Sequence, residues 1–130
     1  MNNQSGEKQK ILVVEDDPDL NNAYCIILAH EGYEVACVTD GLEGITKLEE
    51  FSPDLVLLDL RMPNLDGVGF LRESGINSRF PKAVIIVFTN FDENEEIEQA
   101  FALGASRYVL KSSVTPKDLA KLVREELTGV

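Results

Sequence analysis

Short apolar runs alternate with segments of helical periodicity along this chain, and the alternation constrains the fold more than any other feature of the sequence. Strands are predicted at five places, namely residues 10 to 15, 34 to 38, 55 to 59, 83 to 89 and 107 to 110. A helix is expected after each strand. Because units of this kind form parallel sheets with helices on both faces, the sequence predicts a doubly wound α/β domain.

Polar side chains stand at the ends of four of these predicted strands. They comprise carboxylates, a hydroxyl and an ammonium group: Glu15, Asp16, Asp17, Asp59, Thr89 and Lys111. In an open parallel sheet the carboxyl ends of the strands lie along one edge, where such proteins bind their ligands. We therefore expect these side chains to converge there.

Signals for helix ends agree with this count of elements. Asp17 followed by Pro18 is typical of an N-cap with proline at the first helical position, and Gly32 is placed to end that helix. Further capping signals are Asp40 with Glu43, Asp92 with Glu95, Thr115 with Pro116, and Gly104 at the end of the fourth helix. The third helix, residues 68 to 74, is expected to be short because Gly75 and a polar INSR segment follow it.

The length of 130 residues fits a single domain. We expect a flexible N-terminal arm over residues 1–9, the folded domain over residues 10–127 and a tail over residues 128–130. Acidic residues outnumber basic ones 23 to 12, and the net charge of −11 argues against direct nucleic acid binding. Three basic residues at helical spacing, Lys117, Lys121 and Arg124, fit either a solvated helix face or a contact with an acidic partner.

No apolar run approaches the roughly 20 residues that span a bilayer, and the polar N-terminus does not resemble a secretory signal. A soluble, cytoplasmic protein without membrane contact is therefore expected. Cys25 and Cys37 match no metal or redox motif, and an intracellular chain of this size does not depend on a disulfide. We expect both thiols to be free and to pack in the core.

The three successive carboxylates after the first strand cannot share one task, since neighbours on an extended chain point in different directions. Asp17 best serves as a helix cap, which leaves Glu15 and Asp16 beside Asp59. Like charges in a cleft destabilise a fold unless a cation offsets them. Solvation or capping explains any one of these acids, but the cluster favours a metal site, and an all-oxygen site of this kind suits Mg²⁺.

Asp59 lies at the mouth of a buried strand, LVLLD, and a sharp turn follows it. Carboxylates in such positions act as nucleophiles toward phosphorus, and catalysis of phosphoryl transfer is mostly positioning and charge neutralisation. A metal ion, the Lys111 ammonium, and the Thr89 hydroxyl with a backbone N–H would each neutralise one phosphoryl oxygen. Either residue alone is more simply a polar strand end, but their combination with the acids favours catalysis.

The segments ILVVEDDP and LVLLDLRMPNLDG, followed by Thr89 and Lys111, resemble the receiver domain of bacterial response regulators in order and spacing, over about residues 10 to 127. The resemblance is to receivers of the chemotaxis-regulator type in two-component signalling. It implies a flavodoxin-like, five-stranded parallel sheet in the order 2-1-3-4-5 with five helices.

The resemblance also implies a set of roles at the sheet edge. Asp59 would accept the phosphoryl group from a histidine kinase or a histidine phosphotransfer protein. Glu15 and Asp16 would form the acid pair, and Mg²⁺ would be bound by Asp16, Asp59 and the main-chain carbonyl of Arg61. The protein would catalyse transfer to its own Asp59 and a slow hydrolysis, without being a turnover enzyme.

In the family, phosphorylation is coupled to a change of surface. Thr89 and Lys111 would contact the phosphoryl group, and Thr89 would move inward with Tyr108 following into the vacated space. The surface that changes consists of the fourth helix, the fifth strand and the fifth helix. It would bind a downstream protein effector or a second copy of the chain as a homodimer. From the sequence alone, Tyr108 is more simply an ordinary strand aromatic.

Three positions depart from the common family pattern. Ser112 replaces a proline after the lysine, and since a cis bond before a non-proline residue costs about 3 kcal/mol, a trans path and a displaced Lys111 are expected. Asn90 follows Thr89 at a position where the family mostly has a small residue. Arg61 lies two residues after Asp59. Their side chains are expected to alter the lifetime of the phosphorylated state.

Two alternative functions remain open at this point. One is a degenerate receiver that acts as a constitutive protein-interaction module, for which Ser112 and the short third helix are the motivating departures. The other is a Mg²⁺-dependent phosphohydrolase with an aspartyl intermediate, but Arg61 stands where such enzymes carry a second acid. A flavin site is disfavoured because the acidic EDDP segment would repel a phosphate.

Overall fold

The computed structural model describes residues 8–90 and 94–129, which contain one five-stranded parallel sheet in the order β2-β1-β3-β4-β5. The strands are β1 (Lys10–Val14), β2 (Glu34–Val38), β3 (Leu55–Asp59), β4 (Val84–Thr89) and β5 (Arg107–Leu110). The predicted strand positions and the predicted strand order are both confirmed.

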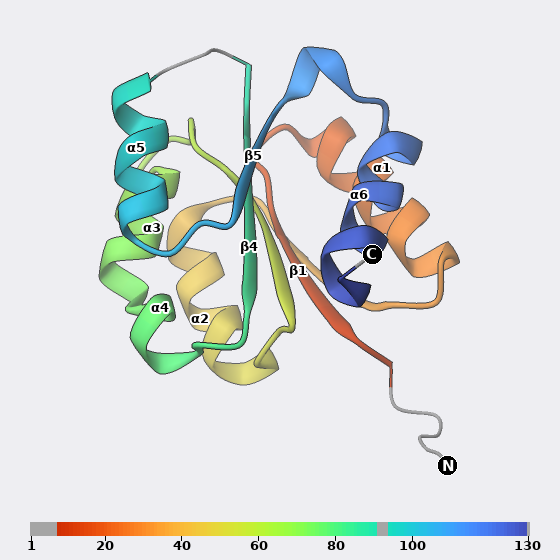
Figure 1. Ribbon diagram of the computed structural model, residues 1–130, viewed down its shortest axis with the longest axis horizontal. Helices are drawn as coiled ribbons and strands as arrows, with labels where there is room; N and C mark the ends of the chain where they lie inside the picture. The colour runs from red at the N-terminus through yellow and green to blue at the C-terminus, as the bar shows by residue number, and fades with distance from the viewer. Residues whose placement is uncertain (1–7, 91–93, 130) are drawn as a thin grey trace.

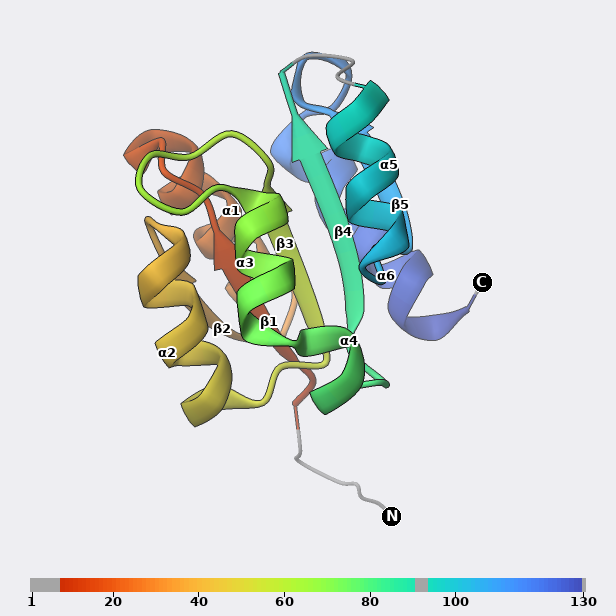
Figure 2. The same ribbon diagram turned by 90° about the vertical axis from the view of Figure 1, so that its left-hand side faces the viewer.

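Helices cover both faces of this sheet (Figures 1 and 2). One face carries α1 (Pro18–His30) and α6 (Pro116–Thr128). The other carries α2 (Gly41–Phe51), α3 (Gly67–Ser74), α4 (Ile76–Arg79) and α5 (Asn94–Ala102). None of the helices among the described residues is both long and apolar enough to cross a membrane.

The sheet separates two hydrophobic cores, and the strand period of two assigns each side chain to one of them. In β1, Ile11 and Val13 pack with α1 and α6, whereas Leu12 and Val14 pack with the helices of the opposite face. All five residues of β3 are buried, as expected for a central strand covered on both sides. The edge strands β2 and β5 are largely half-exposed or exposed.

The helix ends largely follow the sequence signals. Asp17 caps α1 by accepting hydrogen bonds from the backbone N–H groups of Asp19 and Leu20, and Thr115 forms a complete capping box with Asp118 on α6. Asp40 caps α2, but the Glu43 carboxylate accepts from Thr39 and not from Asp40. Only half of that predicted capping box therefore forms. The predicted cap at Asp92 and most of the N-terminal arm lie outside the described residues.

The prediction of five helices is wrong by one, because the polar INSR segment forms the single-turn helix α4. Gly75 ends α3 in the left-handed conformation, with φ of +64°, and its carbonyl accepts hydrogen bonds from Ser78 and Arg79. Ile76 is fully buried and anchors the turn against the core. A glycine therefore reverses the chain here, and the buried Ile76 together with a hydrogen bond from the Arg79 guanidinium to the Ser74 carbonyl holds the next turn.

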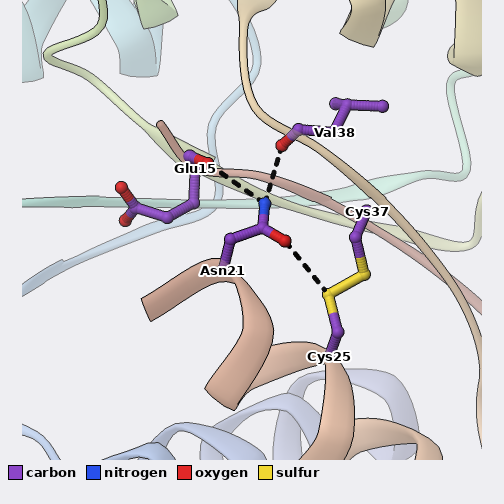
Figure 3. Close-up of a disulfide and its surroundings, with 5 residues drawn as sticks. All are labelled: Glu15, Asn21, Cys25, Cys37 and Val38. Carbon is purple, nitrogen blue, oxygen red and sulfur yellow. Dashed lines mark hydrogen bonds between the residues drawn. A yellow bond between two sulfur atoms is a disulfide. The ribbon is translucent and has the colours of Figure 1, made fainter. Parts of the chain in front are cut away.

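The two cysteines correct a second expectation. Cys25 on α1 and Cys37 on β2 form a disulfide with a Cα–Cα distance of 6.5 Å (Figure 3). Cys25 is half-buried against the core, as expected, but Cys37 is exposed on the edge strand and does not pack in the core. The bridge links a helix to a strand because α1 lies directly against β2.

Candidate functional site

Strand register gathers the polar residues at one edge of the sheet. Val14 pairs with Leu58 across β1 and β3, so that Glu15 and Asp59 follow at the same level. Asp59 in turn pairs with Phe88 on β4, and Thr89 is the next residue of that strand. All three side chains belong to buried residues, with exposed fractions of at most 2%. Glu15 and Asp59 therefore converge as predicted, and Thr89 is buried at the end of the neighbouring strand.

Lys111 closes the cluster from the other side. It begins the short 3-10 helix η1 (Lys111–Ser113), directly after β5. Its Nζ atom lies 2.6 Å from Glu15 Oε1 and 3.0 Å from Asp59 Oδ2, and its side chain is only 7% exposed. The ammonium also lies 5.2 Å from the centre of the Phe88 ring. The expected displacement of Lys111 is therefore not observed.

The absence of a proline at Ser112 does not move the lysine, because η1 supplies another way to turn the chain. All peptide bonds of the described residues are trans. The 3-10 turn leaves Leu110 extended and starts at Lys111 itself, so the side chain still points back over the end of β4. The trans path expected for this loop is confirmed.

Three carboxylates form a group that fits a metal ion. Glu15, Asp16 and Asp59 each offer one oxygen, and these oxygens lie within 4.8 Å of one another. With Lys111 as the buried cation beside them, three negative charges face one positive charge. An oxygen-only donor set with this excess of negative charge fits a hard divalent cation such as Mg²⁺. Asp16 is half-buried, which leaves one side of the group open to solvent.

The same crowding changes the acidities within the site. Burial, followed by the charge of Glu15, raises the pKa of Asp59 to about 7, although Lys111 and the Arg61 backbone N–H act in the opposite direction. Burial also raises the pKa of Glu15. Burial opposes protonation of Lys111, but Glu15 and Asp59 outweigh it and raise the pKa of the ammonium. The site therefore keeps its cation and tends to retain a proton on its acids.

Backbone groups fix the orientation of the two buried acids. Glu15 Oε2 accepts from the N–H of Asp17 at 2.8 Å, and Asp59 Oδ1 accepts from the N–H of Arg61 at 3.1 Å. Each carboxylate thus uses one oxygen for the backbone and turns the other toward Lys111. This division holds both side chains in place while leaving their second oxygens at the centre of the site.

Sequence reasoning missed Asn21, which is 8% exposed and lies on α1. Its Nδ2 atom donates to the carbonyl oxygens of Glu15, at 3.0 Å, and Val38, at 2.8 Å (Figure 3). The available signal was its spacing, since Asn21 shares the buried face of the helix with Tyr24 and Leu28. An amide on an otherwise apolar helix face requires internal partners.

Arg61 points toward α5. Its guanidinium forms an ion pair with Glu96 at 3.0 Å, and the two side chains are 51% and 26% exposed. The loop that follows Asp59 is thereby connected to the start of α5. The sequence contained no periodic signal for this contact, because it joins a loop to a helix across the surface.

Residues 11–124 match the family model of the response regulator receiver domain. The chain belongs to this receiver domain family. Its relatives include the DNA-binding response regulator MtrA of Mycolicibacterium smegmatis, which is 37% identical over 120 residues, or 92% of this chain and 51% of the relative. The regulatory protein AtoC of Escherichia coli is 32% identical over 87% of this chain and 23% of its own length.

The receiver domain thus spans about half, or less, of the curated relatives it matches. Solved structures of similar size also resemble it. A CheY-like receiver domain protein from Methanospirillum hungatei superposes with a TM-score of 0.86 at 30% identity, covering 95% of this chain and 96% of that one. The chemotaxis protein CheY4 of Vibrio cholerae gives a TM-score of 0.83 at 25% identity, covering 92% and 98%. These matches confirm the predicted flavodoxin-like fold.

Tyr108 lies outside the buried cluster of this receiver domain. It is 38% exposed on the edge strand β5, and its ring meets that of Phe101 on α5 edge to face, with 6.5 Å between ring centres. Thr89 on the neighbouring strand is 1% exposed. Of the two residues that were predicted to act as a switch, Thr89 is therefore buried on β4, whereas Tyr108 is exposed on the neighbouring strand β5.

Replacing Asp59 with asparagine should change how stability depends on pH. The folded pKa of about 7 exceeds the ordinary value of 3.8, so between these pH values the folded protein holds a proton that the unfolded chain has released. Stability therefore falls as pH rises through this window. In the presence of a chelator at pH 8, the free energy of unfolding of Asp59→Asn should exceed that of the parent by roughly 1–4 kcal/mol, since one pKa unit corresponds to about 1.4 kcal/mol.

The measurement is urea unfolding of both proteins between pH 4 and pH 8. The gain should shrink toward pH 4, where Asp59 is protonated in the folded protein and about half protonated in the unfolded chain, whose ordinary pKa is 3.8. Asp19→Asn, at an exposed position on α1, serves as the control and should follow the parent at every pH. Equal pH dependence in Asp59→Asn and the parent would contradict the electrostatic account of the site.

Proposed function

We propose that this receiver domain is a phosphoacceptor switch of a two-component phosphorelay, and that Asp59 accepts the phosphoryl group. The observation that carries the proposal is the position of Asp59. Its carboxylate is buried at the end of a central strand, 3.0 Å from an ammonium and within 4.8 Å of two further acids. This is the environment that a carboxylate nucleophile for phosphorus requires.

The transfer itself needs few protein groups. A carboxylate oxygen of Asp59 attacks phosphorus, the bond from phosphorus to the donor's imidazole nitrogen breaks, and the electron pair remains on that nitrogen. The Lys111 ammonium neutralises charge on the phosphoryl oxygens, and the Thr89 hydroxyl donates to one of them. The donor is a phosphohistidine of a histidine kinase or of a histidine phosphotransfer protein.

Mg²⁺ is the cofactor that suits the acid group. Asp16, Asp59 and the main-chain carbonyl of Arg61 would hold the ion, with Glu15 completing the acid pair. When bound, the ion supplies the positive charge that lets a phosphoryl group approach three carboxylates. The excess of negative charge around Lys111 supports this assignment. The chain acts on its own Asp59 and is therefore a signalling switch, with slow hydrolysis of its acyl phosphate, and not a turnover enzyme.

The output surface consists of α5, β5 and α6, which correspond to the fourth helix, fifth strand and fifth helix of the sequence analysis. Thr89 moves toward the phosphoryl group, and the Tyr108 ring follows from its present exposed position against Phe101. A downstream protein, or a second copy of the chain, reads the new surface. A cytoplasmic location is typical of the family.

Direct contact with nucleic acid is not part of this proposal. MtrA of Mycolicibacterium smegmatis is named as DNA-binding, but this chain matches only 51% of its length. The net charge of −11 disfavours binding of phosphate backbones by the receiver domain itself.

Incubation with Mg²⁺ and a small phosphodonor such as acetyl phosphate tests the proposal. Intact mass should increase by one phosphoryl group in the parent, and the increase should be lost on addition of a chelator and in Asp59→Asn. An unchanged mass, or an increase that persists in Asp59→Asn, would favour the alternative of a degenerate receiver that acts as a constitutive interaction module.

The lifetime of the acyl phosphate should depend on Arg61. Its guanidinium is held by the ion pair with Glu96 on α5, and we expect the side chain in this position to restrict the path of water to the phosphoryl group. Arg61→Ala should therefore speed dephosphorylation about two- to five-fold, the change that an interaction of roughly 0.5–1 kcal/mol gives. Glu96→Gln removes the ion pair that holds the guanidinium in this position and should speed dephosphorylation in the same direction, by a smaller factor.

The decay of phosphorylated protein, followed by intact mass after removal of the donor, measures both effects. Arg79→Ala is the matched control, because it removes an exposed arginine that pairs with Glu49 away from the site. Equal decay in Arg61→Ala and the parent would exclude Arg61 from control of the lifetime. The role of Asn90, which was expected to crowd the same path, stays a prediction.

A further inference from the structure

The Cys25–Cys37 disulfide joins α1 to β2, which is an edge strand of the sheet. Cys37 is exposed on the edge strand β2, whereas Cys25 is half-buried on α1. Exposed disulfides tend to be more easily reduced than buried structural ones, because an attacking thiolate reaches the sulfur directly. The bond closes a short segment, with 12 residues of sequence separation. The exposed position of Cys37 makes this bond accessible to external thiols.

Asn21 connects the disulfide to Glu15. Asn21 precedes Cys25 by one helical turn, and its Nδ2 atom donates to the carbonyl oxygens of Glu15 and Val38. Val38 follows Cys37 directly, and its carbonyl also accepts from the N–H of Glu15 at 3.2 Å. Figure 3 shows the arrangement, in which the amide lies between the disulfide and the two carbonyls. Cys25 is therefore one helical turn from Asn21, and Cys37 is next to Val38. Asn21 and Val38 are the residues that hold the Glu15 backbone.

The contact between sulfur and the amide depends on the oxidation state. Cys25 Sγ lies 3.6 Å from Asn21 Oδ1. A disulfide sulfur carries no hydrogen, so this contact is a hydrogen bond only when Cys25 is a thiol. Reduction thus removes the covalent link between α1 and β2 and adds a donor to the amide that holds Glu15.

We propose that Cys25 and Cys37 form a reversible redox modification site whose state sets the affinity of the Glu15–Asp16–Asp59 group for Mg²⁺. The effect on Mg²⁺ rests on the proposed function, whereas the redox chemistry does not. The oxidised form binds the ion more tightly, because the disulfide fixes α1 against β2 and so holds the Glu15 backbone in place before binding. Groups that orient the ligands of a metal commonly change its affinity.

The reaction is thiol–disulfide exchange with a low-molecular-weight thiol such as glutathione. A glutathione thiolate attacks the sulfur of Cys37, the exposed residue of the pair, the bond to Cys25 breaks, and Cys25 leaves as a thiolate. A second glutathione thiolate attacks the glutathione sulfur of the mixed disulfide and releases Cys37. Two glutathione thiols are oxidised to one glutathione disulfide, and their two protons end on the protein thiols. Oxidation follows the reverse path.

The first part of the test titrates the redox state. The full chain is equilibrated in buffers that differ in the ratio of reduced to oxidised glutathione. Free thiols are then blocked with an alkylating reagent, and the intact mass is measured. The expected result is a single transition from no alkyl groups to two within the range of these buffers. A disulfide that persists in excess reduced glutathione, or thiols that persist in excess oxidised glutathione, would overturn the proposal.

The second part compares Mg²⁺ binding by calorimetry in the oxidised and reduced forms. The oxidised form should bind Mg²⁺ at least about three-fold more tightly than the reduced form, a smaller change than the roughly 10- to 100-fold that loss of a supporting group causes. The double variant Cys25→Ser with Cys37→Ser should match the reduced form and show no response to glutathione. Equal affinity in the two redox forms would overturn the coupling. No binding in either form would instead contradict the proposed function, and the alkylation experiment would still decide the redox site.

Discussion

The Lys111 ammonium, held between Glu15 and Asp59 in the buried end of the sheet, is the interaction on which the site depends. It lies 2.6 Å and 3.0 Å from the two carboxylates and is 7% exposed. One cation offsets only part of the charge of three neighbouring acids. Burial of the remaining charge raises the pKa of Asp59 and of Glu15, so that the site favours either a proton or a further cation.

The fold produces this concentration of charge through its topology. Parallel strands must end at the same edge, and the central strands β1, β3 and β4 are too apolar to lie anywhere but the interior. Polar residues placed immediately after them therefore gather around one point. The same edge reaches the surface through Arg61 and Glu96 on one side and through Asn21 and the disulfide on the other. Asp59, where the charge changes, thus lies near two surface features, the Arg61–Glu96 ion pair and the Cys25–Cys37 disulfide.

Much of the fold and the site could be predicted because both follow from local patterns. The alternation of apolar runs with helical segments predicted the strands. The rule that parallel strands end at one edge of the sheet predicted that Asp59 and Lys111 lie close together. The pairing of Cys25 with Cys37 could not be predicted, since it depends on how α1 lies against β2. The Arg61–Glu96 pair and the contacts of Asn21 were missed for the same reason, because tertiary packing determines them. The turn α4 was missed because its contacts, the burial of Ile76 and the hydrogen bond from Arg79 to Ser74, form only when the segment packs on the rest of the fold.

The most direct test of the account is thermal unfolding as a function of Mg²⁺ concentration, at matched ionic strength and pH 8. If a divalent ion offsets the excess charge of Glu15, Asp16 and Asp59, the unfolding temperature should rise with Mg²⁺ and continue to rise above the dissociation constant. At a hundredfold excess over that constant, the folded state gains about 2.7 kcal/mol. Asp16→Asn should weaken the response. An unfolding temperature that Mg²⁺ changes no more than sodium chloride does would contradict the account.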